Sequence, residues 1–273
     1  MLNKYGGIKI NAKDNDLDNK ILGNPKLINS KVYFNGKGNV LFCDKNVILK
    51  DSLITFNGDN AIIFLSENKF TYKLVADIFT DCSLYFGKDN YIPHKIRFII
   101  QEHSNILIGN NCTFSKNIKF RTSDAHPIYD IIKKERVNPP GNIILGDHVW
   151  LFSNVNIFKN SEIGSGAIIG NDSLVTNKII NSNSYNIGNP IKEIQNNVCY
   201  NSKYVGNTST NASDEKWFSD KNIFTYIEEE YYSLTEFKDK NFSLWDMYEK
   251  LTFFEKILKN NSKNRFFRIK KRI

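Results

Sequence analysis

Residues 145–178 read LGDHVW-LFSNVN-IFKNSE-IGSGAI-IGNDSL-VTNK, a run that divides into sixes without a break. The first place of each hexad is aliphatic, and the fifth is small or β-branched. The first places are Leu145, Leu151, Ile157, Ile163, Ile169 and Val175, and the fifth places are Val149, Val155, Ser161, Ala167 and Ser173. A helix would space its apolar residues by three and four, and a flat strand would space them by two. The six-residue period fits neither.

A six-residue repeat predicts a β-solenoid with three short flat faces per turn. The first-place side chains would fill the interior, and the small fifth-place residues would fit where the chain bends. Gly, Asn and Asp suit the other bend positions because they tolerate a positive φ. The chain contains 38 Asn, which suits many such corners, although an AT-rich genome would also enrich Asn.

The repeat continues upstream with decreasing regularity. Residues 108–125 keep the pattern, with Ile108, Phe114 and Phe120 in first place and Cys112 and Ile118 in fifth. Residues 32–65 retain short apolar stretches between Asn, Gly and Asp corners, as expected of less regular first coils. Residues 66–100 are ambiguous and leave room for an insertion at Lys69–Thr80.

Residues 126–141, HPIYDIIKKERVNPPG, interrupt the register between the two regular blocks. The segment ends in Pro-Pro-Gly, so we expect a loop that protrudes from one corner. Insertions in solenoids are placed in this way, and such loops often line a binding site.

The composition changes after Gln195. Residues 196–215 are polar and read as a linker, whereas residues 217–260 are rich in aromatic side chains. Apolar residues recur every three or four positions from Leu244 to Leu258, which predicts an amphipathic helix with Ser243 as its N-cap. We expect this segment to pack on the solenoid or on a neighbouring subunit.

These boundaries divide the chain into three parts. Residues 1–195 form the predicted solenoid domain, with irregular first coils at 1–84 and the loop at 126–142. Residues 196–215 form the linker, and residues 216–273 form a helical C-terminal segment with a basic tail.

The net charge of +8, from 37 Lys+Arg against 29 Asp+Glu, arises at the end of the chain. Residues 256–273 hold eight basic side chains and no acidic one, so the remainder is neutral. A nucleic-acid-binding protein would more often spread its positive charge over a folded face. The tail is interpreted either as a solvated terminus or as a contact for anionic lipid or acidic glycan.

Sequence features that bear on location point to the cytoplasm. No window approaches 18 uninterrupted apolar residues, which argues against a membrane-spanning helix. The first residues lack the apolar run of a secretory signal. The four cysteines, Cys43, Cys82, Cys112 and Cys199, form no Cys-x-x-Cys pair and are interpreted as small buried residues in a reducing compartment.

The stretch GDHVWLFSNVNIFKNSEIGSGAIIGNDSLVT at 146–176, followed by NIGNPIKEI at 186–194, resembles the hexapeptide-repeat, left-handed β-helix acyltransferases. It looks most like the O-acetyltransferases of bacterial sugars and cell-surface polysaccharides. The resemblance covers residues 85–195 well and residues 30–84 loosely. It implies a left-handed parallel β-helix, a homotrimer, and acetyl-CoA bound in the groove between adjacent solenoids.

The segment Arg121-Thr122-Ser123-Asp124-Ala125-His126 is similar to the family segment whose histidine is the catalytic base. A sugar hydroxyl is a poor nucleophile at neutral pH, and an imidazole can take its proton as the oxygen attacks the thioester. The resemblance implies that His126 is this base, and Asp124 would orient the ring or bind the acceptor. A corner histidine that caps the loop is the structural alternative.

Trp150 follows His126 by 24 positions, where family members commonly carry a tryptophan close to the catalytic histidine of the same or an adjoining subunit. Its indole could stack on the sugar or donate its N–H. The alternative is an outward aromatic side chain that packs at the trimer interface.

The resemblance also implies residues that contact the donor. Ser153, Asn171 and Thr176 match positions along the pantetheine arm, whereas Lys178 (or Asn177) and Lys192 match basic positions near the phosphates. Three departures from the family pattern weaken this carry-over: the usual Thr-Lys is Thr176-Asn177-Lys178, the usual following proline is Asn181, and Ile191 replaces a small alanine.

Three other functions remain open from the sequence. An N-acetyltransferase of an amino-sugar nucleotide would need the same base. A non-catalytic β-solenoid that binds glycan would not need His126 or Lys192. A metal site like that of solenoid carbonic anhydrases would need three of the histidines at 94, 103, 126 and 148, but their spacing does not demand one, and we expect no metal.

Overall fold

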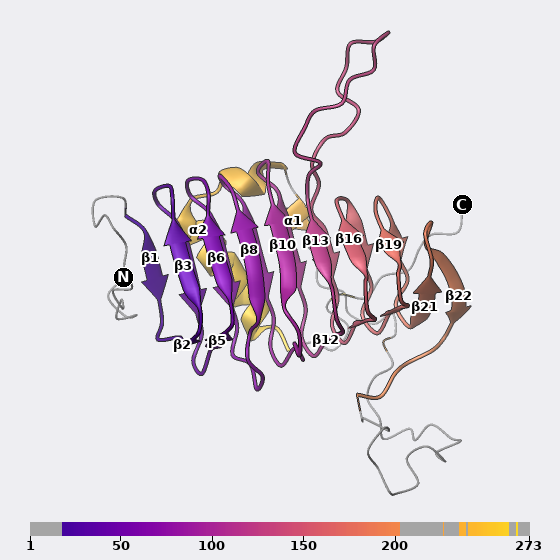
Figure 1. Ribbon diagram of the computed structural model, residues 1–273, viewed down its shortest axis with the longest axis horizontal. Coiled ribbons are helices and arrows are strands. Elements are labelled where there is room, and N and C mark those ends of the chain that lie inside the picture. The colour runs from indigo at the N-terminus through magenta and orange to yellow at the C-terminus, as the bar shows by residue number, and fades with distance from the viewer. Residues whose placement is uncertain (1–17, 203–225, 227–234, 239, 262–265, 267–273) are drawn as a thin grey trace, which may run out of the picture.

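The computed structural model describes residues 18–202, 226, 235–238, 240–261 and 266. They form a left-handed parallel β-solenoid of about seven turns, with helices packed along one side and a long loop projecting from one edge (Figure 1). Among the described residues, no helix has the length and apolar character needed to cross a bilayer.

Successive strands along the chain visit three faces of a prism in turn. The first face contains β1 (Lys20–Leu22), β4 (Val40–Cys43), β7 (Ile62–Leu65), β9 (Ser83–Phe86), β11 (Asn105–Ile108), β14 (Ile143–Leu145), β17 (Ser161–Ile163) and β20 (Ile179–Ile180). The third face contains β3 (Lys31–Phe34), β6 (Leu53–Phe56), β8 (Leu74–Ile78), β10 (Ile96–Ile100), β13 (Lys119–Arg121), β16 (Asn156–Phe158) and β19 (Leu174–Val175).

The second face is less continuous. It begins with β2 (Lys26–Ile28) and β5 (Ile48–Lys50), and resumes with β12 (Thr113–Phe114), β15 (Trp150–Leu151), β18 (Ile168–Ile169), β21 (Ser184–Ile187) and β22 (Lys192–Asn196). Isolated bridges at Tyr72 and Tyr91 continue the pairing of its two parts. All neighbouring strands are parallel except β21 and β22, which are antiparallel.

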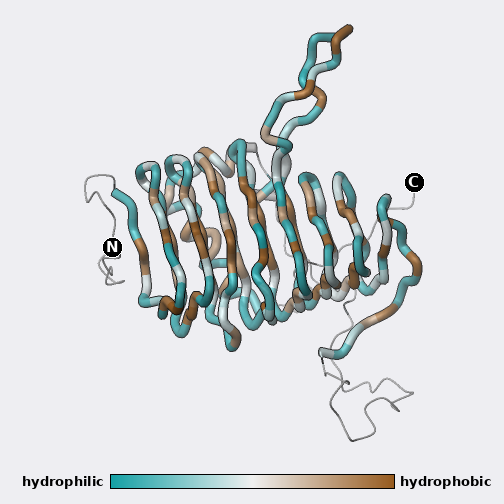
Figure 2. Tube along the Cα trace, viewed as in Figure 1, coloured by the Kyte–Doolittle hydropathy of each residue, from teal (hydrophilic) through white to brown (hydrophobic). Residues whose placement is uncertain are grey.

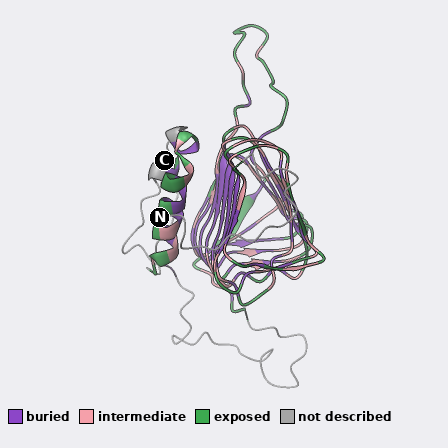
Figure 3. Cartoon of the chain, turned by 90° about the vertical axis from the view of Figure 1, so that its left-hand side faces the viewer, coloured by how far each residue is buried: buried purple, intermediate pink, exposed green. Residues whose placement is uncertain are grey.

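The interior confirms the hexad prediction. All the first-place and fifth-place side chains of residues 145–175 are buried, as are those of the block that starts at Ile108. Aromatic side chains stack from coil to coil inside the prism: the rings of Phe98 and Phe120 lie 5.0 Å apart and nearly parallel. A purple interior lined by buried residues is visible down the axis (Figure 3), and the hydropathy along the trace alternates accordingly (Figure 2).

Coil length explains why the period wanders upstream. Ile144 pairs with Glu162, so that coil advances 18 residues. Val40 pairs with Ile62, 22 residues later, because the early faces carry strands of four or five residues. The possible insertion at Lys69–Thr80 is wrong, since β8 lies in this segment and pairs with both β6 and β10. Lengthened faces, rather than an insertion, absorb the additional residues.

The corners confirm the predicted role of Asn and Asp. Among the described residues, 15 of the 20 non-glycine positions with a positive φ are Asn or Asp. Several of them hydrogen-bond to the equivalent corner of the next coil: Asn117 donates to Asn154 at 3.0 Å, and Asn154 donates to Asp172 at 2.8 Å. The amide ladder therefore satisfies the side chains that the bends select.

The C-terminal segment packs on the solenoid, as predicted. It contains α1 (Thr235–Lys238), the 3₁₀ helix η4 (Lys240–Leu244) and α2 (Met247–Lys259). The prediction of Ser243 as N-cap is wrong: Ser243 lies within η4, and Asp246 caps α2 in a reciprocal capping box with Glu249. The carboxylate at 246 can accept the orphan N–H of the first turn, which explains the later start.

Aromatic side chains join this segment to the outer side of the first face. The ring of Phe254 lies 5.7 Å from Phe64 and 5.3 Å from Tyr85. Phe237, Phe242 and Phe253 complete the buried cluster. Figure 3 shows the helices lying against one side of the prism. Most of the predicted linker, the first 17 residues and most of the basic tail lie outside the described residues.

Replacing Phe254 with alanine should lower the free energy of unfolding by about 3–5 kcal/mol, because it empties a fully buried aromatic site. Urea unfolding of the full chain measures this change. Tyr248→Ala on the exposed side of α2 is the matched control and should change stability by less than about 0.5 kcal/mol. Equal effects of the two substitutions would contradict the packing described here.

Candidate active site

The long loop leaves the prism at the edge between the third and first faces, which we call the loop edge. The chain departs after β13 and returns at Gly141, whose N–H donates to the carbonyl of Thr122 at 3.0 Å. Tyr129 and Arg136 form an antiparallel bridge within the loop. The protrusion predicted for residues 126–141 is therefore confirmed (Figure 1).

A carboxylate–guanidinium pair fastens the base of this loop. The Arg136 guanidinium donates to both carboxylate oxygens of Glu102, at 2.6 and 3.0 Å. The Ser123 hydroxyl also donates to Glu102, and it accepts the N–H of Ala125 at 3.0 Å. This bidentate geometry is the strongest form of ion pair available to arginine, so the returning strand of the loop is held against the preceding coil.

A buried asparagine connects the two strands of the loop. The side-chain amide of Asn138 donates to the carboxylate of Asp124 and to the carbonyl of His126, each at 2.9 Å. Its oxygen accepts the N–H of Ile128 at 2.6 Å. Asn138 therefore fixes the backbone on both sides of His126.

A lysine from the next coil completes the network. The ammonium of Lys159 lies 2.5 Å from the carboxylate of Asp124, and the Lys159 side chain is only 11% exposed. The hydrogen bonds from Lys159 and Asn138 hold the pKa of Asp124 below its usual range. Hydrogen bonds from Arg136, and then from Ser123, similarly lower the pKa of Glu102. Both carboxylates are thus stabilised in the ionised form.

The imidazole of His126 is exposed at the root of the loop. The residue before it, Ala125, has a φ of +69°, a left-handed conformation that alanine adopts at a cost. Such conformations persist where the surroundings impose them, and here the network around Asn138 does so. The described contacts of Asp124 go to Lys159 and Asn138, so within one chain its carboxylate anchors the loop.

Trp150 lies on a different part of the prism, at the start of β15 on the second face. Its ring packs 4.1 Å from Phe152 and 5.1 Å from Tyr200. Its indole N–H is buried, and among the described residues it has no hydrogen-bond acceptor. The loop edge is the corner opposite the second face, so one chain does not bring His126 and Trp150 together.

The predicted donor contacts fall into three places. Ser153 and Asn171 occupy successive coils at the edge between the second and third faces, where the N–H of Ser153 donates to the Asn171 side chain at 3.0 Å. Thr176 and Lys178 lie in the last coil on either side of the loop edge. Lys192 is exposed at the start of β22.

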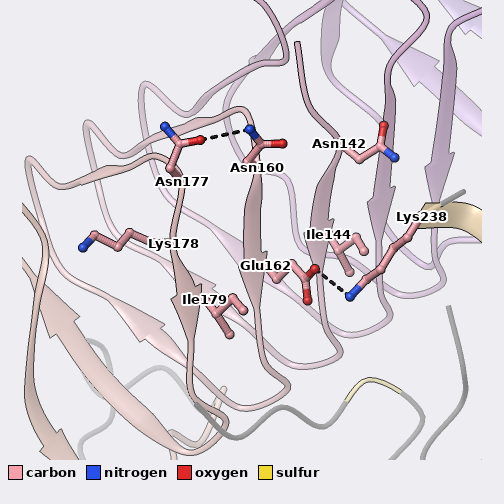
Figure 4. Close-up of a pocket in the computed structure, with 8 residues that line it drawn as sticks. All are labelled: Asn142, Ile144, Asn160, Glu162, Asn177, Lys178, Ile179 and Lys238. Atoms are coloured by element: carbon pink, nitrogen blue, oxygen red, sulfur yellow. Dashed lines mark hydrogen bonds and ion pairs between the residues drawn. The ribbon is translucent and has the colours of Figure 1, made fainter. Parts of the chain in front are cut away.

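A pocket of about 430 Å³ opens beside the loop edge, on the outer side of the first face. Its lining residues are Asn142, Ile144, Asn160, Glu162, Asn177, Lys178, Ile179 and Lys238. Figure 4 shows the three asparagines along one rim and the two lysines at opposite ends. The C-terminal segment contributes Lys238, whose ammonium lies 2.6 Å from Glu162.

The other histidines have separate surroundings. His103 pairs with Asp81 at 3.1 Å, and His148 stacks on Tyr200 with ring centroids 4.0 Å apart. Burial lowers the pKa of His148. Within the described part of the chain, no group of three or more His, Cys, Asp or Glu side chains is placed to hold a metal ion. Cys43, Cys82 and Cys112 are buried as predicted, and Cys199 is half-buried.

Sequence reasoning missed five polar residues of this region: Glu102, Arg136, Asn138, Lys159 and Lys238. Their partners are 14 to 76 positions away, as with Asn138–Asp124 and Lys238–Glu162. One signal was present for Lys159: it stands within a regular hexad, at a position where the register allowed a corner residue.

Comparison with known proteins follows from this geometry. No family model matches the chain. A polysialic acid O-acetyltransferase of Neisseria meningitidis is 36% identical over 84 residues, which cover 31% of this chain and 39% of the relative. A protein of the same name from Escherichia coli O1:K1 / APEC is 37% identical over 59 residues, covering 22% of this chain and 19% of the relative. These alignments therefore span less than half of the curated relatives.

Solved structures extend the similarity along the solenoid. The polySia-specific acetyltransferase NeuO superposes with a TM-score of 0.62 at 30% identity, over 73% of this chain and 90% of that chain. The polysialic acid O-acetyltransferase OatWY superposes with a TM-score of 0.54 at 24% identity, over 70% and 95% of the two chains. The second of these likenesses concerns the fold alone.

Arg136→Gln should loosen the loop, because it leaves Glu102 without its bidentate partner. We expect trypsin to cleave the variant after Lys133 or Lys134 several-fold faster than the wild type, as measured by mass spectrometry of timed digests. Lys133→Gln removes one cleavage site without touching the base of the loop and is the control. If Arg136→Gln is cleaved no faster than wild type, the ion pair does not hold the loop.

Lys159→Met should raise the pKa of Asp124 towards its ordinary value, since the main cause of its lowering is removed. An acid with a lowered folded-state pKa stabilises the fold above its ordinary range of about 4, and that contribution is lost as the pH falls through the lowered value. NMR titration of the carboxyl carbon in wild type and variant measures both values. An unchanged pKa in the variant would rule out Lys159 as the cause.

Proposed function

The chain belongs to the hexapeptide-repeat acetyltransferase family that includes the polySia-specific acetyltransferase NeuO, and from this premise we propose that it O-acetylates a bacterial cell-surface glycan. The observation that carries the proposal is the exposed imidazole of His126, held at the root of a loop by the Asp124–Asn138–Lys159 network. Polysialic acid, the substrate in the names of the relatives, or a similar capsular polymer is the proposed acceptor.

The proposed reaction is direct transfer from acetyl-CoA. The acceptor hydroxyl oxygen attacks the thioester carbonyl carbon while the His126 imidazole takes the hydroxyl proton. The tetrahedral oxyanion then collapses, the carbon–sulfur bond breaks, and the imidazolium returns the proton to the CoA sulfur. The products are the acetyl ester and free CoA thiol.

The network gives each polar residue a task in this reaction. Asp124 and Asn138 fix the backbone beside His126, so the ring meets the acceptor without reorganising the loop. Lys159 keeps Asp124 ionised and in place. We propose this anchoring as the role of Asp124, in preference to a direct contact with the imidazole.

A complete site needs a second copy of the chain in this proposal. His126 and Trp150 lie on opposite parts of one prism, and the buried indole N–H of Trp150 has no acceptor among the described residues. In a homotrimer the second face of one subunit would meet the loop edge of the next. Trp150, Ser153 and Asn171 would then line one wall of the donor groove, with Thr176 and Lys178 on the other and Lys192 towards its end.

We place the enzyme in the bacterial cytoplasm, where acetyl-CoA is made, with the basic C-terminal tail as a contact for the anionic inner membrane or for the glycan itself. The free cysteines support a reducing compartment.

His126→Ala should lower acceptor-dependent release of CoA thiol by about 10²–10⁴-fold, the usual contribution of a general base. The assay uses acetyl-CoA with a panel of capsular glycans, and NMR of the product locates the ester. Tyr129→Ala, in the same loop but outside the network, is the control for loop damage. Full activity of His126→Ala on a working acceptor would refute the proposed mechanism.

Co-expressed His126→Ala and Trp150→Ala subunits should recover about one quarter of the wild-type activity, because a trimer assembled at random forms one intact His–Trp pair in four. Each variant expressed alone should be inactive. Activity is measured on hybrid trimers purified through two different tags. No recovery in hybrids would place both residues in the same subunit's site, or show that Trp150 is dispensable.

A further inference from the structure

The pocket beside the loop edge lies where the helical cover of the first face ends. Outward side chains at Phe42, Phe64, Tyr85 and Leu107 are buried under the C-terminal helices. The next coils of the same face carry Ile144, Glu162 and Ile179, which pair in register and form the floor of the pocket. An apolar face thus becomes a polar depression next to the catalytic loop.

We propose that this pocket binds a carboxylate-bearing sugar of the acceptor glycan, a role that rests on the proposed function and assigns a task to the C-terminal segment. The lining has the chemistry of a sugar site. Three corner asparagines offer amide donors and acceptors to hydroxyl groups, while Ile144 and Ile179 offer apolar surface to a sugar ring. Lys238 supplies a cation for the carboxylate.

Lys238 can serve the ligand without leaving Glu162. An ammonium group has three donors, and the ion pair with Glu162 uses one of them. The Lys238 side chain is 35% exposed, so its remaining donors can reach a ligand in the pocket. The segment is also positioned from the solenoid, because the Asn142 side chain donates to the carbonyl of Phe237 at 3.1 Å.

Continuity with the loop favours the acceptor as the occupant. The loop returns to the prism at Gly141, and the next residue, Asn142, belongs to the rim. Asn160 follows Lys159, the residue that anchors Asp124, and it donates to Asn177 of the next coil at 3.0 Å. A polymer bound in the pocket would therefore extend towards His126 along one edge.

Charge favours a singly anionic sugar over the nucleotide of CoA. The floor of the pocket contains Glu162, which can accept hydroxyl protons from a sugar but repels a cluster of phosphates. Lys178, at the other end of the pocket, could serve either ligand. The test therefore rests on Lys238 and Glu162 and leaves Lys178 unchanged.

The experiment measures binding of an α2,8-linked oligosialic acid to the full-length protein by calorimetry, without acetyl-CoA. Lys238→Met should weaken the affinity about fivefold at low salt, and Lys259→Met on α2 should leave it unchanged. Glu162→Gln should keep or strengthen binding. A neutral glucose hexamer should bind more weakly than the sialic acid oligomer, and adenosine 3′,5′-bisphosphate should not displace it.

Several results would overturn the proposal. They are no binding of the oligomer to wild type, equal binding of the neutral hexamer, displacement by the bisphosphate, or an unchanged affinity in Lys238→Met. Weakening by Glu162→Gln as much as by Lys238→Met would show that the ion pair only anchors α1. Glycan binding without acetyl transfer would refute the proposed function and retain this site, whereas transfer unaffected by Lys238→Met would do the reverse.

Discussion

Each coil of this solenoid must reverse direction at three corners within about 18 to 22 residues, and the backbone there must adopt left-handed conformations. Asn and Asp tolerate those conformations, and their short side chains reach the equivalent corner of the next coil. The ladder from Asn117 through Asn154 to Asp172 shows how one residue type meets both needs. Stacked strands, a filled interior and level faces all depend on these corners repeating in register.

The exceptions among the corner residues mark the region of chemistry. Glu102, Ala125 and Lys134 adopt a positive φ without being Asn or Asp, and all three belong to the loop or to the coil that holds it. The protein therefore departs from its own repeat where His126 is presented. The first face is given to the C-terminal helices, the second face carries Trp150, and the loop edge between the third and first faces carries the polar network. One prism thus separates attachment, aromatic contact and proton transfer.

The regular part of the fold was readable because a buried first-place residue every six positions leaves few alternatives. The early coils were not, since faces widened to four or five residues break the period while keeping the same interior. His126 could be identified as a candidate from a local motif, and the loop from a broken register. Lys159 and Arg136 could not, because an ion pair across 34 or 35 positions depends on where the loop returns. Lys238 needed the docking of a segment whose helices begin later than their sequence suggests.

The final strand has a consequence for how copies of this molecule meet. Parallel solenoids expose an unpaired strand edge at each end, and such edges invite another chain to add on. Here β22 runs antiparallel to β21, and all five of its residues are exposed, with Lys192 and Glu193 among them. A further parallel coil cannot continue the second face past this reversed, charged strand. The molecule therefore ends its own stack at this point, and growth into fibres through this face is blocked by the direction of a single strand.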